Sequence, residues 1–157
     1  MKILLLDDNT ETYEVLREVA SLSGSEVIYF NDVIEAQKYI LEHPDIDAII
    51  SEKYINNRSS AEILGLIKKN NMNIPVILLT DELSEDEKDY YKRIGITEFF
   101  YKPFNPLELM TSIVEHLKNY KGEEYIKETL HTKEESRESL KAIVKKIINL
   151  LKKLFGR

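Results

Sequence analysis

The chain has 157 residues and a net charge of −6, with 43% hydrophobic and 32% charged residues. This composition is ordinary for a globular protein. The absence of cysteine excludes disulfide scaffolds, zinc–thiolate sites and thiol catalysis. No apolar run approaches the ~18 residues of a membrane-spanning helix, and the first residues do not have the pattern of a signal peptide. We therefore expect a cytoplasmic protein.

Strand-like and helix-like segments alternate along the first 120 residues. Five short apolar runs predict strands, and each is followed by a segment with the apolar spacing of a helix. The predicted strands cover residues 2–6, 26–30, 47–51, 75–79 and 97–101. Five strand–helix units in succession predict an α/β domain, in which a parallel sheet is covered by helices on both faces.

Capping residues mark the ends of the predicted helices. Serine followed three residues later by glutamate is the spacing of a capping box, and asparagine followed by proline is typical of a helix start. Helices are therefore expected to start at Asn31, at Ser59 with Glu62, at Ser84 with Glu87, and at Asn105 with Pro106. Gly95 is expected to end the fourth helix.

Residues 121–157 are predicted to form a helical extension, after a first domain at 1–120. From about residue 140 the extension is basic and amphipathic. It has six basic residues and no acidic ones over 140–157, which leaves −12 on the rest of the chain. Its apolar stripe comprises Leu140, Ile143, Val144, Ile147, Ile148, Leu151, Leu154 and Phe155. Such a stripe is expected to pack on its own domain or a second copy, on an anionic membrane surface, or in a partner's groove.

Four of the five predicted strands end in chemically useful groups. These are Asp7–Asp8, Glu52, Thr80–Asp81 and Lys102–Pro103. Ligands of open α/β sheets bind at the carboxyl ends of the strands. Paired carboxylates suit Mg²⁺, and a lysine with a hydroxyl suits an anion.

This set, with Phe104 after Pro103, resembles the receiver domain of response regulators over roughly residues 1–120. The resemblance implies a flavodoxin-like, doubly wound five-stranded sheet of order 2-1-3-4-5, and a two-component signalling module that is not an enzyme. It implies a phosphoacceptor at position 52 and a Mg²⁺ site formed by Asp7, Asp8 and Glu52. It further implies phosphate-site or switch roles for Thr80, Phe99 and Lys102, and a cis Lys102–Pro103 bond.

The sequence departs from the family at the acceptor, which is usually aspartate and here is Glu52. Asp81 stands where the family usually has a small residue, and the usual proline and glycine after the acceptor are absent from 56–60. Because glutamate is one methylene longer than aspartate, its carboxylate can reach Lys102 and the Thr80 hydroxyl without phosphate. A phosphate-independent receiver, a scaffold without a switch and a phosphorylated receiver therefore stay open.

The function expected from the sequence is signal transduction by protein–protein interaction, independent of phosphorylation. The alternatives are a phosphorelay member still phosphorylated by a histidine kinase, and a structural adaptor that presents the carboxyl-terminal helix. Expected partners are a histidine kinase or a downstream effector, or a second copy in a homodimer, with a membrane surface as a further partner of that helix. The acidic domain and the short extension predict no specific nucleic-acid binding.

Overall fold

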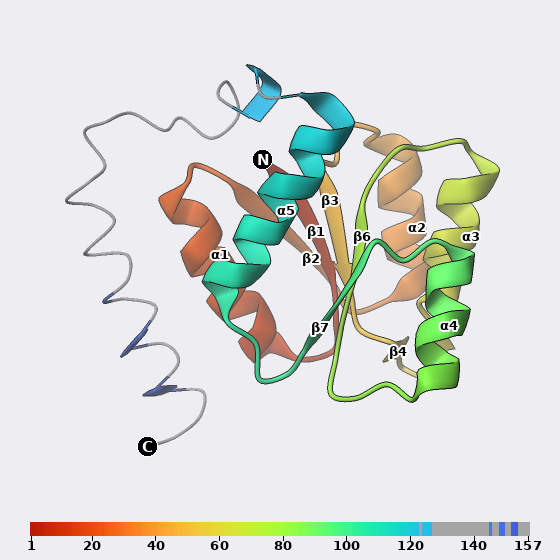
Figure 1. Ribbon diagram of the computed structural model, residues 1–157, viewed down its shortest axis with the longest axis horizontal. Coiled ribbons are helices and arrows are strands. Elements are labelled where there is room, and N and C mark those ends of the chain that lie inside the picture. Colours follow the sequence, from red (N-terminus) through yellow and green to blue (C-terminus); the bar gives the residue numbers. More distant parts are fainter. Residues whose placement is uncertain (123, 127–144, 146–147, 150–151, 154–157) are drawn as a thin grey trace.

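The computed structural model describes residues 1–122, 124–126, 145, 148–149 and 152–153. Seven strands and five helices are found in residues 1–122, and Figure 1 shows their arrangement. They are β1 (Lys2–Leu6), α1 (Thr10–Leu22), β2 (Glu26–Phe30), α2 (Val33–Glu42), β3 (Ala48–Ser51), β4 (Tyr54–Ile55), β5 (Arg58–Ser59), α3 (Ala61–Lys69), β6 (Val76–Thr80), α4 (Glu85–Ile94), β7 (Glu98–Tyr101) and α5 (Pro106–Lys121).

The five longer strands form one parallel sheet in the order β2-β1-β3-β6-β7. This is the predicted 2-1-3-4-5 order when the short strands β4 and β5 are set aside. Helices α1 and α5 cover one face, and α2, α3 and α4 cover the other (Figure 1). The predicted doubly wound fold is confirmed. Most of the amphipathic extension falls outside the described residues, and no described helix is both long and apolar enough to cross a membrane.

Each face of the sheet has its own hydrophobic core, because successive strand side chains point to opposite faces. On β1, Ile3 and Leu5 join the core under α1 and α5, whereas Leu4 and Leu6 join the core under α2, α3 and α4. All four are at most 1% exposed. Near-continuous apolar strands of this kind are typical of parallel sheets that are buried on both sides.

Two of the predicted helix starts are wrong in detail. Helix α2 is capped by Asp32, whose side chain accepts the Glu35 N–H at 2.9 Å, and not by Asn31. Helix α3 begins after Ser60, which makes no side-chain cap. The Ser84–Glu87 capping box, the Asn105–Pro106 start and the left-handed Gly95 at the end of α4 (φ 116°) are confirmed.

A short hairpin explains why the capping box predicted for α3 does not form. Strands β4 and β5 pair antiparallel around Asn56 and Asn57, which have φ values of 49° and 66°. Asparagine tolerates this left-handed backbone well, so the two residues can form the turn. Ser59 is thereby used in β5, and Glu62 pairs with Arg58 at 2.6 Å instead of capping the helix.

The chain after α5 is bonded to the opposite end of the sheet from the predicted site. The Tyr125 hydroxyl donates to Asp47 Oδ1, and Ile126, at 7% exposed, joins the core under α1 and α5. Asp47 also accepts the Lys2 N–H at 2.7 Å and lies 3.6 Å from Lys121 Nζ. The packed unit thus reaches at least residue 126, whereas the predicted boundary near residue 120 stays a prediction.

The contact between Tyr125 and Asp47 can be tested by removing one hydroxyl. Tyr125→Phe is expected to lower the free energy of unfolding by about 1–3 kcal/mol, because a buried carboxylate oxygen loses its donor. Urea denaturation would measure this. Tyr120→Phe on the exposed side of α5 is the matched control and should change stability by less than ~0.5 kcal/mol. Equal stabilities for the two variants would show that the hydroxyl contributes nothing.

Candidate functional site

The predicted site residues meet at the carboxyl edge of the sheet because their strands are neighbours in register. Leu6 of β1 pairs with Ser51 of β3, and Thr80 of β6 pairs with Tyr101 of β7. The next residues are held by backbone hydrogen bonds across the same strands. Glu52 donates its N–H to the Leu6 carbonyl at 2.9 Å, and Lys102 donates to the Thr80 carbonyl at 2.8 Å.

One ammonium group lies between two carboxylates at this edge. Lys102 Nζ donates to Asp7 Oδ2 and to Glu52 Oε2, both at 2.9 Å. The three side chains are 17%, 0% and 14% exposed, in the order Lys102, Asp7 and Glu52. The pairing of Glu52 with Lys102 that the sequence predicts is therefore present.

The other carboxylate oxygens are occupied by backbone donors. Asp7 Oδ1 accepts the Asn9 N–H at 2.9 Å, and Glu52 Oε1 accepts the Lys53 N–H at 2.6 Å. Each of the four oxygens consequently has one donor. Such charge-assisted bonds are stronger than bonds between neutral groups, so both carboxylates are held in defined positions.

Burial and pairing shift the protonation of this cluster in identifiable ways. Burial raises the pKa of Asp7 above its ordinary value, although the Lys102 ammonium and the Asn9 N–H act in the opposite direction. Burial alone would lower the pKa of Lys102, but its hydrogen bonds to Asp7 and Glu52 outweigh burial and raise it. Lys102 therefore stays charged at neutral pH, as a counter-ion for the carboxylates.

The residues predicted to bind Mg²⁺ do not gather as a cation site would require. Asp8 is exposed, and no three acidic or histidine side chains converge among the described residues. One oxygen of Asp7 and one of Glu52 bond to the Lys102 ammonium, so one positive charge already lies between the two carboxylates. In this arrangement the residues do not fit a divalent cation, although hard cations favour carboxylates.

Thr80 and Phe99, the predicted phosphate-binding and switch residues, lie on strands beside Lys102. Thr80 is buried at 4% exposed, but among the described contacts its hydroxyl does not bond to Glu52. Phe99 is half-buried, packs against the core under α2, α3 and α4, and lies under Lys92 Nζ at 6.0 Å. The expected cis Lys102–Pro103 bond is present.

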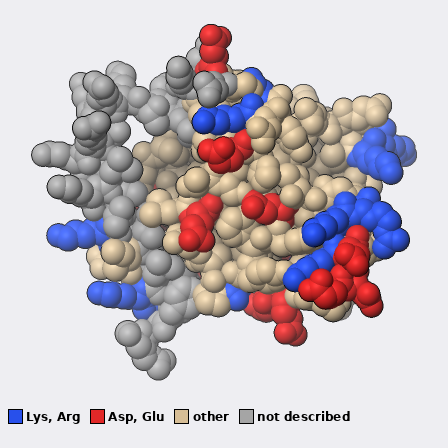
Figure 2. All heavy atoms as spheres, in the orientation of Figure 1, with Lys and Arg blue, Asp and Glu red and all other residues tan. Residues whose placement is uncertain are grey.

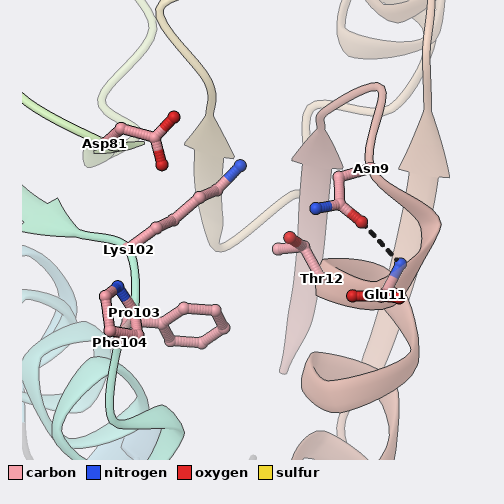
Figure 3. Close-up of a pocket in the computed structure, with 7 residues that line it drawn as sticks. All are labelled: Asn9, Glu11, Thr12, Asp81, Lys102, Pro103 and Phe104. Atoms are coloured by element: carbon pink, nitrogen blue, oxygen red, sulfur yellow. Dashed lines mark hydrogen bonds between the residues drawn. The ribbon is translucent and has the colours of Figure 1, made fainter. Parts of the chain in front are cut away.

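A pocket of about 280 Å³ is lined in part by Lys102, and Figure 3 shows the residues around it. Asn9 and Thr12 line it from the start of α1, and Lys102 and Phe104 line it from the segment after β7. The exposed Asp81 contributes a carboxylate to the same pocket. It thus adds negative charge where an anionic phosphodonor would have to approach.

Sequence reasoning missed Lys53 and Glu87 as residues connected to this edge. Lys53 Nζ lies 2.8 Å from Glu87 Oε2, which links the residue after Glu52 to the first turn of α4. The position of Glu87 could be predicted, since the Ser84–Glu87 capping box predicts where α4 begins. The position of Lys53 relative to α4 depends on the hairpin after β3, which the periodicity of the sequence does not show.

Comparison with known proteins agrees with this geometry. Residues 3–114 match the response regulator receiver domain family. The chain is 26% identical over 113 residues to the phosphate regulon transcriptional regulatory protein PhoB of Pseudomonas aeruginosa, which covers 71% of this chain and 49% of that protein. It is 29% identical over 112 residues to the transcriptional regulatory protein CpxR of Escherichia coli, covering 71% and 47%. The chain thus spans about half the length of these curated relatives.

Solved structures give the same answer for the fold. The signal receiver domain of a putative Luxo repressor protein from Vibrio parahaemolyticus is 25% identical with a TM-score of 0.71, over 80% of this chain and 95% of that one. A response regulator receiver domain protein from Clostridium thermocellum is 26% identical with a TM-score of 0.69, over 76% and 96%. Sequence, site geometry and fold agree, and the chain belongs to the response regulator receiver domain family.

Proposed function

We propose that this receiver domain signals through protein–protein contacts and does not depend on phosphorylation, because Glu52 replaces the acceptor aspartate. The observation that carries the proposal is the 2.9 Å contact between Glu52 Oε2 and Lys102 Nζ. In the proposed mechanism, this contact replaces the contact between Lys102 and a phosphoryl group that the resemblance to receiver domains implies. The domain's own side chains then favour the signalling conformation in which Glu52 is paired with Lys102.

The bonds of the Glu52 carboxylate also oppose phosphoryl transfer to it. Attack on a phosphodonor would require an oxygen that is free to approach, but Oε2 is bonded to Lys102 and Oε1 to the Lys53 N–H. Transfer to either oxygen would therefore have to break one of these two hydrogen bonds.

The proposed output is contact with a protein partner, either a histidine kinase, a downstream effector or a second copy in a homodimer. Exposed tyrosines on two neighbouring elements support a contact surface. Tyr90 on α4 is 43% exposed and Tyr101 at the end of β7 is 39% exposed, whereas Tyr91 is buried. The space-filling view shows both signs of charge interleaved over α4 (Figure 2). Aromatic residues are enriched at protein interfaces.

The carboxyl-terminal extension leaves a second mode of contact within the proposal. The basic helix predicted from about residue 140 would add a protein-binding or membrane-binding element to a cytoplasmic domain. Of its predicted stripe, the described residues include Ile148, which is 46% exposed. The alternative is an adaptor role for this helix. It differs from phosphorylation-independent signalling because it depends on the residues after 139.

Phosphorylation is tested directly by incubation with acetyl phosphate and Mg²⁺, followed by intact mass. We expect no phosphoryl adduct on the wild-type chain, because both oxygens of Glu52 are engaged and Lys102 is neutralised by carboxylates. Glu52→Asp is the matched comparison, since it restores the shorter carboxylate of the family. An adduct on the wild type that disappears in Glu52→Gln would refute the proposal and favour the phosphorelay alternative.

A second experiment tests whether the Lys102 ammonium excludes a metal ion. Lys102→Met leaves Asp7 and Glu52 without their shared cation, and breaking a buried pair in this way is expected to cost about 3–5 kcal/mol of stability. Millimolar Mg²⁺ should then raise the melting temperature of Lys102→Met and leave that of the wild type unchanged at equal ionic strength. Adding Asp7→Asn to Lys102→Met should abolish the Mg²⁺ effect. If Mg²⁺ stabilised the wild type and Lys102→Met equally, the Lys102 ammonium would not be the group that excludes the metal ion.

A further inference from the structure

Lys53 makes contacts with several separate parts of the domain. Its N–H donates to Glu52 Oε1 at 2.6 Å, and its carbonyl accepts the Ser60 N–H at 3.0 Å, next to the start of α3. Its ammonium group lies 2.8 Å from Glu87 Oε2 in the first turn of α4. A single residue thus connects the site carboxylate to the helix layer on that side of the sheet.

On the helix side, the contact uses a carboxylate that also caps α4. Glu87 Oε1 accepts the Ser84 N–H at 3.1 Å, while Ser84 Oγ accepts the Glu87 N–H at the same distance. Oε2 is left to pair with Lys53. The hydrogen bond to Lys53 lowers the pKa of Glu87, and the same bond raises the pKa of Lys53. Both groups therefore remain charged at neutral pH. Because Glu87 lies in the first turn of α4, a displacement of the Lys53 ammonium acts on that turn.

The hairpin that begins after Lys53 is itself fixed. Ile55 is 1% exposed within the core, so β4 cannot move freely away from the sheet. Tyr91 of α4 is buried, and its hydroxyl lies beside Ser59 and Ser60. Figure 1 shows the hairpin strand β4 next to α4. The segment after Lys53 is therefore held in place, so a displacement at position 52 acts on Lys53 itself.

We propose that Lys53 is a positioning residue that couples the carboxylate at position 52 to the start of α4. A change in the charge or position of Glu52 would move the Lys53 backbone, and with it the ammonium group that pairs with Glu87. This connection does not pass through Thr80 or Phe99. A change at the start of α4 would alter the surface on which Tyr90 is exposed, and therefore the surface that a partner contacts. This coupling through Lys53 rests on the proposed function only in treating Glu52 as the group that sets the signalling state.

The test compares amide NMR spectra of the wild type, Glu52→Gln, Lys53→Met and the double variant. Glu52→Gln should shift the amide resonances of residues 84–88 in the wild-type background, because the Lys102 pairing is weakened. In the Lys53→Met background the same substitution should shift them no more than it shifts the amides of α2. That helix serves as the internal reference, because none of its residues bonds to Glu52 or Lys53 in the described structure.

Two further variants separate coupling from a general loss of structure. Lys88→Met removes another ion pair of α4, with Glu85 at 3.2 Å, but leaves Lys53 in place. The response to Glu52→Gln should persist in that background. Glu87→Gln keeps an oxygen for the capping box and removes the charge that pairs with Lys53. It should suppress the response as Lys53→Met does, and it provides the test should Lys53→Met fail to fold.

Two results would overturn the inference. One is an undiminished shift of residues 84–88 in both the Lys53→Met and the Glu87→Gln backgrounds, which would mean that the effect travels by another route. The other is no shift of these residues on Glu52→Gln in the wild-type background. Neither result bears on phosphorylation, which the intact-mass experiment decides, so failure of the coupling and failure of the proposed function are distinguishable.

Discussion

The Lys102 ammonium lies between Asp7 and Glu52 and bonds to both, so the positions of the two carboxylates depend on it. In the strand order β1-β3-β6-β7, Lys102 follows the edge strand, so its side chain must pass the end of β6 to reach the other two. Asp7 is fully buried, and a buried charge requires a partner. The length of lysine and the burial of Asp7 therefore explain why the two carboxylates are held together instead of repelling each other.

The extra methylene of Glu52 has a defined consequence in this setting. It lets one oxygen reach Lys102 while the other accepts the N–H of the following residue. Two carboxylates and one ammonium still leave a negative balance, to which the exposed Asp8 and Asp81 add. The raised pKa of Asp7 is consistent with that balance, because burial and a nearby like charge both disfavour ionisation.

The fold and most site positions could be predicted from the sequence because they depend on local patterns. Apolar runs predicted the strands, and the polar residues directly after them had to meet at one edge of a parallel sheet. The β4–β5 hairpin was missed because its strands have only two residues each and carry no periodicity. The Lys53–Glu87 pair depends on that hairpin, and the contact of Tyr125 with Asp47 spans 78 residues, so neither follows from local sequence.

Under the proposed function, a receiver domain whose site is filled by its own side chains obtains its input from something other than phosphorylation. A ligand shifts a conformational equilibrium only by its difference in affinity for the two states. Under the proposed function no phosphoryl group supplies that difference, so a binding partner has to supply it. Because coupling between sites is reciprocal, a partner that prefers the conformation with Glu52 paired to Lys102 would in turn strengthen that pair. Position 52 would then determine how strongly a partner binds, and partner binding would determine how often the pair is formed.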